Sequence, residues 1–226
     1  SKKIIDIKPF TWWMNWLGRR EVRAIGFDPT DVNNPDIFNI WKGYDMSREL
    51  CSNFQDSQAQ PVIDHIMNAW CSGDKKQFKY VMDYFAHIIQ KPEKKIGVVL
   101  CLKSKQGGGK GVILNKLNEI IGNAHYCVNA NANYLFGDFN GQLEGKILVN
   151  LDECFWGGDK KMESLMKNKI TESSQTINKK NKEAYMIDCY ANYIITTNND
   201  WFVGATEDNR RFYCLELKET QFSATT

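Results

Sequence analysis

The sequence lacks the segments that would place it in or across a membrane. Its 226 residues contain no run of about 18 consecutive apolar residues, and the first ten, SKKIIDIKPF, lack the apolar stretch of a secretion signal. We therefore expect a soluble, intracellular protein with no membrane contact. The chain begins with Ser rather than Met and ends in FSATT, and we expect it to be a piece of a longer protein.

Metal-ligand spacing is also missing. Seven cysteines stand far apart with no CxxC pair, and only three histidines accompany them. A zinc site or a disulfide framework needs closer and better matched spacing, so reduced thiols are the expected state. The cysteines lie at positions 51, 71, 101, 127, 154, 189 and 214.

Charge is nearly balanced over the whole chain but not along it. The net charge is +2, which by itself says nothing about nucleic acid. From Lys160 to Glu183, however, seven lysines face three glutamates, a local excess of +4 (7 minus 3). This segment is either a solvated helix face or a surface that binds an anionic partner.

The apolar pattern changes near Pro92. Before it, apolar residues recur at three- and four-residue steps, which predicts helices over 61–70 and 78–89, after an aromatic cluster at 10–17. After it, apolar runs alternate with helical spacing, which predicts strands at 96–102, 147–151, 193–197 and 212–217 and helices near 110–121 and 160–170. Continuous apolar strands suit a parallel sheet covered on both faces. The prediction is an α/β fold with a parallel central sheet (92–226), preceded by a smaller helical region (1–91). Tryptophans 12, 13, 16, 41 and 70 are expected to be packing residues rather than base-stacking platforms.

A glycine-rich turn carries the strongest chemical signal. Residues 97–117 read GVVLCLKSKQGGGKGVILNKL: an apolar run, three glycines, Lys110 and a helical segment. Glycines let backbone amides approach an anion, and a helix N-terminus favours negative charge. The turn departs from the phosphate-loop pattern GxxxxGK[ST] at its first and last positions. The residues expected to contact nucleotide phosphates are Ser104, Gln106, Gly107, Gly108, Gly109, Lys110 and Gly111.

A second apolar strand, in KILVNLDECFW, ends in Asp152 and Glu153. Strand ends in open α/β sheets face the ligand crevice, and at its exit the chain can turn both carboxylates toward phosphates. Asp152 would hold Mg²⁺, directly or through water, and Glu153 would orient the water that attacks the γ-phosphate. Adjacent acidic residues are also common in purely structural roles.

Two further signals follow. The apolar strand in YIITTNN ends in Asn198 and its neighbour Asn199. Either amide is suited to sense a γ-phosphate without adding charge, although an ordinary Asn turn gives the same pattern. Arg210 and Arg211 precede the last strand. An arginine there could stabilise transition-state charge in a neighbouring subunit, or both could be surface arginines.

In this order the four signals resemble the superfamily 3 helicases, AAA+ motors that viruses and phages often fuse to a primase. The resemblance covers roughly residues 90–217. SKQGGGKG looks like that family's A motif, LVNLDE its B motif and IITTN its C motif, with Lys110, Asp152, Glu153 and Asn198 in the matching positions. Arg210 and Arg211 fall 12 and 13 positions after Asn198, where the family places its arginine finger.

Further elements of the resemblance concern DNA and assembly. Residues 171–187 look like the family's channel hairpin, with Lys179, Lys180 and Lys182 at its tip against the DNA backbone. FNIWKGYDM, residues 38–46, resembles the segment before the motor, so residues 1–91 would be helicase-associated and contribute to oligomerisation. The resemblance implies a ring, expected to be a hexamer, with ATP and Mg²⁺ between subunits. It also implies single-stranded or forked DNA as substrate, a primase or polymerase as partner, and a location in the host cytoplasm or at the site of phage DNA replication.

Two other readings remain open. A small-molecule kinase uses the same phosphate loop, but its lid is usually rich in arginine, and arginine occurs here only at 19, 20, 23, 48, 210 and 211. A nucleic-acid-binding or assembly module with a decayed loop is compatible with Ser104 and Gly111. Gly111 also stands where the family usually has a Ser or Thr whose hydroxyl binds Mg²⁺. A chain of this family without that hydroxyl is expected to bind Mg²⁺ more weakly.

Overall fold

The computed structural model describes residues 8–30, 34–46, 55–105, 108–129, 131, 137–153, 160–198 and 210–218. Its centre is a sheet of five parallel strands in the order β4-β5-β8-β3-β9. The strands are β3 (Val99–Lys103), β4 (Tyr126–Asn129), β5 (Leu148–Asp152), β8 (Asn192–Thr197) and β9 (Phe212–Glu216). Every residue of β8 is buried, as expected for a strand covered on both faces. The predicted α/β fold with a parallel central sheet is confirmed. Strand β4 was not predicted.

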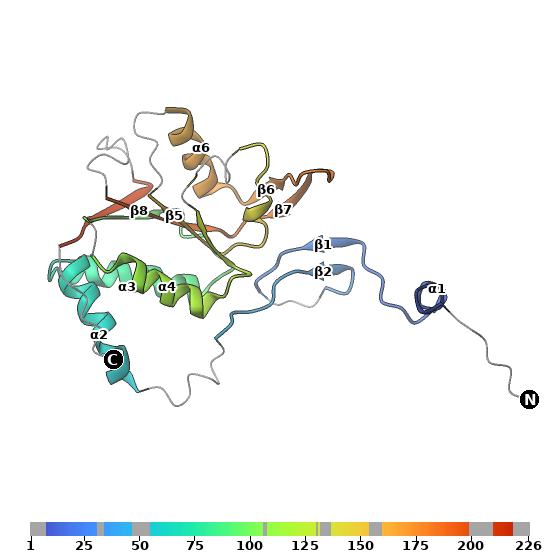
Figure 1. Cartoon of the computed structure of the whole chain (residues 1–226), viewed down its shortest axis with the longest axis horizontal. Helices are drawn as coiled ribbons and strands as arrows, with labels where there is room; N and C mark the ends of the chain where they lie inside the picture. Colours follow the sequence, from blue (N-terminus) through green and yellow to red (C-terminus); the bar gives the residue numbers. More distant parts are fainter. Residues whose placement is uncertain are drawn as a thin grey trace, which may run out of the picture.

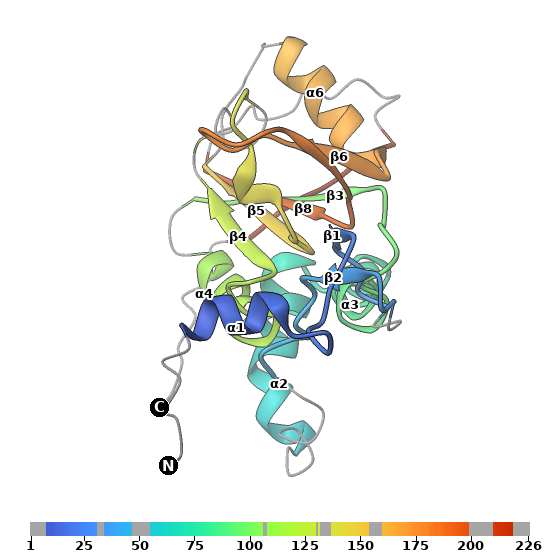
Figure 2. The ribbon, with the colours of Figure 1, turned by 90° about the vertical axis from the view of Figure 1, so that its right-hand side faces the viewer.

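Helices cover both faces of this sheet (Figures 1 and 2). Helices α3 (Lys75–Gln90) and α4 (Lys110–Ile121) lie on one face, and α6 (Lys160–Thr171) lies on the other. Helix α3 begins where the Asp74 carboxylate accepts hydrogen bonds from the backbone amides of Lys76 and Gln77. Helix α4 begins after Gly109 and ends at Gly122, both of which have positive φ. The helices predicted near 110–121 and 160–170 are therefore present.

The N-terminal region is only partly helical. It contains α1 (Pro9–Asn15), α2 (Asp56–His65) and a π-helical turn (Ile66–Trp70), which with α3 account for the helices predicted at 61–70 and 78–89. It also contains a parallel pair of three-residue strands, β1 (Ala24–Gly26) and β2 (Ile37–Asn39), which no sequence pattern predicted. None of the helices in the described ranges has the length and apolar composition needed to cross a bilayer.

The tryptophan prediction is half right. Trp70 is buried and Trp41 packs against the core. Trp12, Trp13 and Trp16 are instead 53%, 44% and 48% exposed. They belong to α1 and the residue after it, which stand at the far end of an extended segment, away from the sheet (Figure 1). Helix α1 has no buried residue, so its aromatic side chains are not part of this chain's core.

One continuous core joins α3 to the sheet. Tyr84 is buried in α3, and its hydroxyl donates to the backbone oxygen of Tyr193 in β8 at 2.9 Å. The same cluster of buried side chains includes Trp70 and Ile88 on one side and residues of β3, β5 and β8 on the other. A division of the chain at residues 91 and 92 stays a prediction.

Candidate functional site

The carboxyl ends of the three central strands border one cleft of about 720 Å³. Register brings these ends level, because Lys103 of β3 pairs with Thr197 of β8 and Asp152 of β5 pairs with Thr196. The first two turns of α4 complete the wall. The lining residues are Lys105, Gly108, Gly109, Lys110, Gly111, Val112, Leu114, Asn115, Val128, Asn150, Asp152, Glu153, Thr196 and Asn198. The structure therefore gathers the described parts of the A, B and C motifs into one site.

Lys110 is the first residue of α4, and its ammonium group is held at the strand ends. Its Nζ donates to the backbone oxygens of Ser104 at 3.1 Å and Thr197 at 2.9 Å, and to Oδ1 of Asn198 at 2.9 Å. Burial lowers the pKa of Lys110, and the carboxylates of Glu153 and Asp152 act in the opposite direction. The cleft therefore holds a cation beside two carboxylates, with oxygen partners that an anionic ligand could replace.

The glycine turn delivers the chain into α4. Gly109 caps the helix with φ of 71°, a left-handed conformation that a side chain would strain. The first amides of α4 have no partner within the helix and are directed to its N-terminal end, as in anion-binding helix termini. Gly108, Gly109 and Gly111 line the cleft, whereas Gln106 and Gly107 lie outside the described residues.

Ser104 and Gly111 are the two departures from the phosphate-loop pattern. Ser104 is buried, and its hydroxyl donates to the backbone oxygen of Lys105 at 2.7 Å. A Cβ atom on Gly108 would lie 2.5 Å from that hydroxyl oxygen, so the serine packs directly against the turn. Gly111 is exposed, and a Cβ atom there would meet nothing within 4 Å. The absence of a hydroxyl at position 111 is therefore not imposed by crowding.

Asp152 is oriented by a neighbouring strand. The hydroxyl of Thr196 in β8 donates to Asp152 Oδ1 at 2.5 Å, and Thr196 itself is buried. This bond fixes one carboxylate oxygen and leaves the other available. Within the described ranges, no three His, Cys, Asp or Glu side chains cluster closely enough to bind a metal by themselves. A hard cation held by one or two carboxylates together with phosphate oxygens and water is the arrangement that Mg²⁺ takes beside nucleotides, and Asp152 fits it.

Glu153 turns into the cleft because its backbone leaves the strand conformation. Its φ is 51°, in the left-handed region that non-glycine residues rarely occupy. Its amide still pairs with Thr196, donating to the backbone oxygen at 2.8 Å. Its carboxylate accepts a hydrogen bond from the backbone amide of Asn198 at 3.2 Å. Consecutive strand residues normally face opposite sides of a sheet, and this turn brings both carboxylates to one cleft.

Arg210 and Arg211 lie at the opposite end of the sheet from this cleft. The backbone oxygen of Arg211 accepts from the amide of Val99, the first residue of β3. The cleft lies at the other end of β3, about five residues or roughly 16 Å along the strand. Because all five strands run in the same direction, neither arginine is at the cleft of its own chain.

Lysines 179, 180 and 182 lie in the turn of a hairpin formed by β6 (Ser174–Ile177) and antiparallel β7 (Tyr185–Asp188). Lys180 and Lys182 are exposed. Lys179 instead forms an ion pair with Glu144, which also accepts a hydrogen bond from the Tyr185 hydroxyl. Burial acts to raise the pKa of Glu144, but these two hydrogen bonds lower it below its ordinary value. The three lysines thus differ: two face solvent, and one anchors the hairpin.

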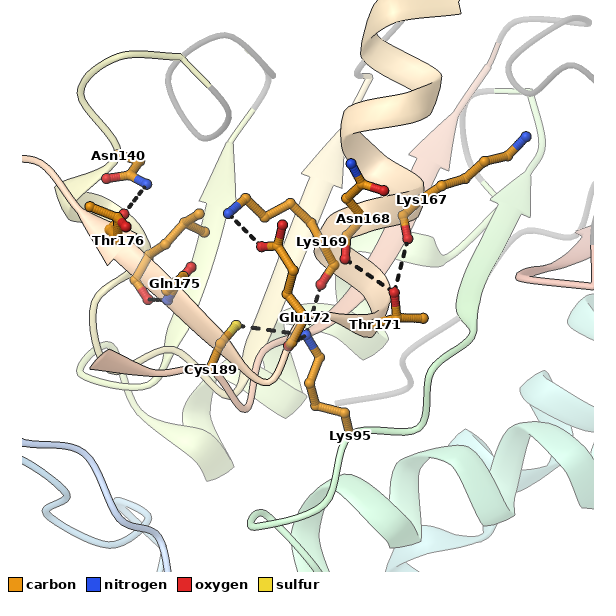
Figure 3. Close-up of polar contacts among 11 residues, drawn as sticks. Lys95, Asn140, Lys167, Asn168, Lys169, Thr171, Glu172, Gln175, Thr176 and Cys189 are labelled. Carbon is orange, nitrogen blue, oxygen red and sulfur yellow. Dashed lines mark hydrogen bonds and ion pairs between the residues drawn. The ribbon is translucent and has the colours of Figure 1, made fainter. Parts of the chain in front are cut away.

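The base of the hairpin is fastened to the body by partly buried polar contacts (Figure 3). The Lys95 ammonium donates to the backbone oxygens of Lys169 at 2.7 Å and Glu172 at 2.9 Å, at the C-terminal end of α6. It also lies 3.6 Å from Cys189 Sγ, just beyond β7. Asn140 Nδ2 donates to the backbone oxygen of Thr176 on the other side. The amide of Asn178, at the start of the turn, donates to Asn140 Oδ1 at 2.8 Å, so the hairpin is anchored at its base and at the start of its turn, while Lys180 and Lys182 stay exposed.

Sequence reasoning missed three residues of the site. Thr196 stands two positions before Asn198, and a hydroxyl at a strand end beside a predicted carboxylate was a usable signal. Asn150 lines the cleft from inside an otherwise apolar strand, where a buried amide is unusual. His65 contacts the glycine turn, with Nε2 3.3 Å from the Gly108 oxygen, and nothing in the local sequence indicates this long-range contact.

Comparison with known proteins finds a family model and a phage protein that are similar to this chain. The sequence model of a family of unknown function (DUF5906) matches residues 102–211. The DNA primase-polymerase of Nitratiruptor phage NrS-1 is 31% identical over 160 residues, which cover 67% of this chain and 22% of that protein. One structure of the NrS-1 C-terminal region (305–718) shares the fold with a TM-score of 0.74 and 23% identity, over 86% of this chain and 47% of that one. A second structure of the same region, the A form, has a TM-score of 0.60 and 27% identity, over 70% of this chain and 37% of that one. The chain thus spans about a fifth of the phage protein and less than half of its solved region, and it is similar to part of a phage primase-polymerase.

Proposed function

We propose that this chain is an ATP-hydrolysing DNA translocase and helicase motor of a phage-type replication protein, of the superfamily 3 kind. One observation carries the proposal: Lys110, Asp152, Glu153 and Asn198 border a single cleft at the amino end of α4. A cation, a helix N-terminus and two carboxylates are the groups that bind and hydrolyse a nucleoside triphosphate. The similarity to part of a phage primase-polymerase supports a role in replication.

Each group has a separate task in this proposal. The Lys110 ammonium and the amides at the start of α4 bind the β- and γ-phosphates. Asp152 holds Mg²⁺, directly or through water, and the metal neutralises charge on the phosphates. The Glu153 carboxylate accepts a hydrogen bond from the attacking water and orients it toward phosphorus. Asn198 contacts Lys110 through its side chain and Glu153 through its backbone amide, so it is placed to respond when the γ-phosphate leaves.

The segment that follows β5 connects the cleft to the lysine-bearing hairpin proposed to bind DNA. The hairpin is inserted between β5 and β8, which are neighbours in the sheet and carry Asp152 and Asn198 at their ends. The inserted segment leaves β5 beside Asp152 at the cleft and enters β8 at Asn192, at the opposite edge of the sheet, so a shift of the Asp152 end on hydrolysis would act on the start of this segment. Lys180 and Lys182 would grip phosphates of single-stranded or forked DNA without reading sequence.

The arginines complete the site only in an assembly. Arg210 and Arg211 lie at the far end of the sheet from their own cleft, so an arginine finger must act on the cleft of another subunit. We propose a ring, with six subunits as the expected number, in which one of these arginines stabilises transition-state charge on a neighbour's nucleotide. A primase or polymerase segment would act with this motor.

The test is phosphate release from ATP with and without single-stranded DNA, combined with mass measurement by light scattering. The proposal expects hydrolysis that DNA stimulates, in a species of ring mass. Lys110→Ala should abolish it. Lys116→Ala is the matched control, because Lys116 is on the same helix but is exposed and forms an ion pair with Glu119. Monomeric, DNA-independent turnover would contradict the motor and favour a small-molecule kinase, and no turnover would favour a binding module.

A further inference from the structure

His65 lies against the glycine turn from outside the sheet. It is the last residue of α2 and is buried, with 8% exposure. Its Nε2 is 3.3 Å from the backbone oxygen of Gly108, 43 positions away in sequence. A Cβ atom on Gly109 would lie 2.2 Å from the same nitrogen. The imidazole ring therefore packs directly on the peptide that joins Gly108 to Gly109.

The geometry of a trans peptide gives this contact a consequence. The carbonyl and the amide N–H of one peptide point in opposite directions, because the unit is planar. A carbonyl oxygen only accepts hydrogen bonds, so Nε2 of His65 carries the proton and donates. With the Gly108 oxygen held toward His65, the N–H of Gly109 must point away from it. Glycine adopts positive and negative φ about equally readily, so without this contact the peptide between Gly108 and Gly109 would rotate easily.

The position of His65 is itself fixed. The π-helical turn that follows it, Ile66–Trp70, buries Ile66, Ala69 and Trp70 in the core. Gly108 and Gly109 form part of the cleft wall beside Lys110. His65 thus contacts this peptide without being among the residues that line the cleft, whereas both of its glycines do line it, so the contact can set the direction of a single cleft amide.

We propose that His65 is a positioning residue that holds the Gly108–Gly109 peptide so that the Gly109 amide donates to a bound nucleotide phosphate. The inference rests on the proposed function only in assuming that phosphates occupy this cleft. It gives the N-terminal helix α2 an indirect part in the phosphate site. His65 does not touch the nucleotide, and it acts through the backbone.

Two substitutions separate the hydrogen bond from packing. His65→Gln keeps an N–H donor that can reach the Gly108 oxygen, whereas His65→Leu fills similar space without a donor. ADP affinity is measured by calorimetry on the full chain, beside the unfolding temperature of each variant. A hydrogen bond to a charged group is strong enough that its loss should weaken ADP binding about tenfold or more in His65→Leu. His65→Gln should stay within about threefold of the unchanged chain.

The outcomes are distinguishable. Equal weakening in both variants, or unchanged affinity in His65→Leu, would overturn the positioning role. If His65→Leu does not fold, ADP affinity is compared between His65→Gln and a third variant, His65→Asn, whose shorter donor cannot reach the Gly108 oxygen. Weaker ADP binding in His65→Asn alone supports the positioning role of His65. Any other pattern overturns it. If the unchanged chain binds ADP but shows no DNA-stimulated hydrolysis, the motor proposal fails while the His65 result stands. If it binds no ADP, both fail.

Discussion

The ammonium of Lys110 donates to the side-chain oxygen of Asn198 across 2.9 Å, which joins the start of α4 to the end of β8. Asn198 in turn donates its backbone amide to Glu153 at the end of β5. One residue therefore touches both the group proposed to bind phosphate and the group proposed to orient water.

Asn198→Ala should slow hydrolysis more than it weakens binding. The variant keeps the backbone amide and Lys110 but removes the side-chain oxygen that positions the ammonium. We expect the maximal rate to fall about 10- to 100-fold, which corresponds to roughly 1.4 to 2.8 kcal/mol, with ADP affinity changed by less than about threefold. Steady-state kinetics and ADP calorimetry measure the two effects. A large loss of ADP affinity with an unchanged maximal rate would contradict this role.

Thr196→Val should raise the Mg²⁺ concentration needed for hydrolysis. Valine keeps the shape of the buried threonine but removes the hydroxyl that orients Asp152. We expect the half-saturating Mg²⁺ concentration to increase about tenfold, in line with the effect of losing the hydrogen-bond partner of a metal-binding carboxylate. Thr176→Val, an exposed threonine of β6, is the control and should change nothing. Equal Mg²⁺ requirements in both variants would show that the Thr196 bond does not prepare a metal site.

Gly111→Ser should have the opposite effect. The space around Gly111 is open, so a serine side chain enters without a clash, and it improves helix propensity by a few tenths of a kcal/mol. The added hydroxyl supplies the Mg²⁺ ligand that the turn lacks, and we expect the half-saturating Mg²⁺ concentration to fall severalfold. Magnesium titration of the hydrolysis rate tests this. An unchanged requirement would mean that the missing hydroxyl does not limit metal binding.

The double variant Lys180→Ala with Lys182→Ala should spare basal hydrolysis and weaken DNA binding. Both side chains are exposed, so their loss leaves the fold intact. If each contacts one phosphate, the slope of log affinity against log salt should fall by about 1.4 for single-stranded DNA. Lys75→Ala with Lys76→Ala, two exposed lysines at the start of α3, is the control of equal charge. Equal salt slopes in both double variants would remove the hairpin from the DNA interface.

Lys179→Met should reduce stability in a pH-dependent way. Hydrogen bonding from Lys179 and Tyr185 lowers the pKa of Glu144 in the folded chain, so this carboxylate stabilises the fold above its ordinary pKa. This stabilisation is lost as the pH falls from the ordinary pKa of a glutamate to the lower pKa that Glu144 has in the folded chain. We therefore expect the variant to be less stable by about 1 kcal/mol at pH 7 and nearly equal to the unchanged chain at about pH 3. Urea unfolding at both pH values measures the difference. A pH-independent difference would show that packing, rather than the ion pair, is lost.

Much of the sheet could be predicted because its strands are covered on both faces. Residues 147–151 and 193–197 are near-continuous apolar runs, and in the structure they are central strands. The polar residues that end these runs meet at one edge because parallel strands share a direction. Strand β4 has only four residues, which is too short for an alternation of apolar and polar residues to be recognised.

What the sequence did not predict depends on contacts between distant segments. Lys179 pairs with Glu144, 35 positions away, so its neighbours Lys180 and Lys182 do not share its environment. His65 meets Gly108 only because α2 packs beneath the turn. The apolar composition of α1 suggested burial, yet no part of the described chain covers it. Such outcomes follow from tertiary packing, which local pattern does not encode.

The common direction of the five strands also restricts the symmetry of any assembly that the arginines complete. The cleft is at one edge of the sheet and Arg211 is at the other, so a contact that brings them together joins two unlike surfaces. A two-fold dimer completes both clefts only if the cleft and the arginine belong to one self-complementary face, on which each subunit's arginine meets the other's cleft. Unlike surfaces instead repeat head to tail, closing into a cycle when the rotation between neighbours divides a full turn and otherwise growing as a filament. Closed symmetry therefore makes every cleft equivalent and complete, whereas an open filament leaves the cleft at one end without an arginine.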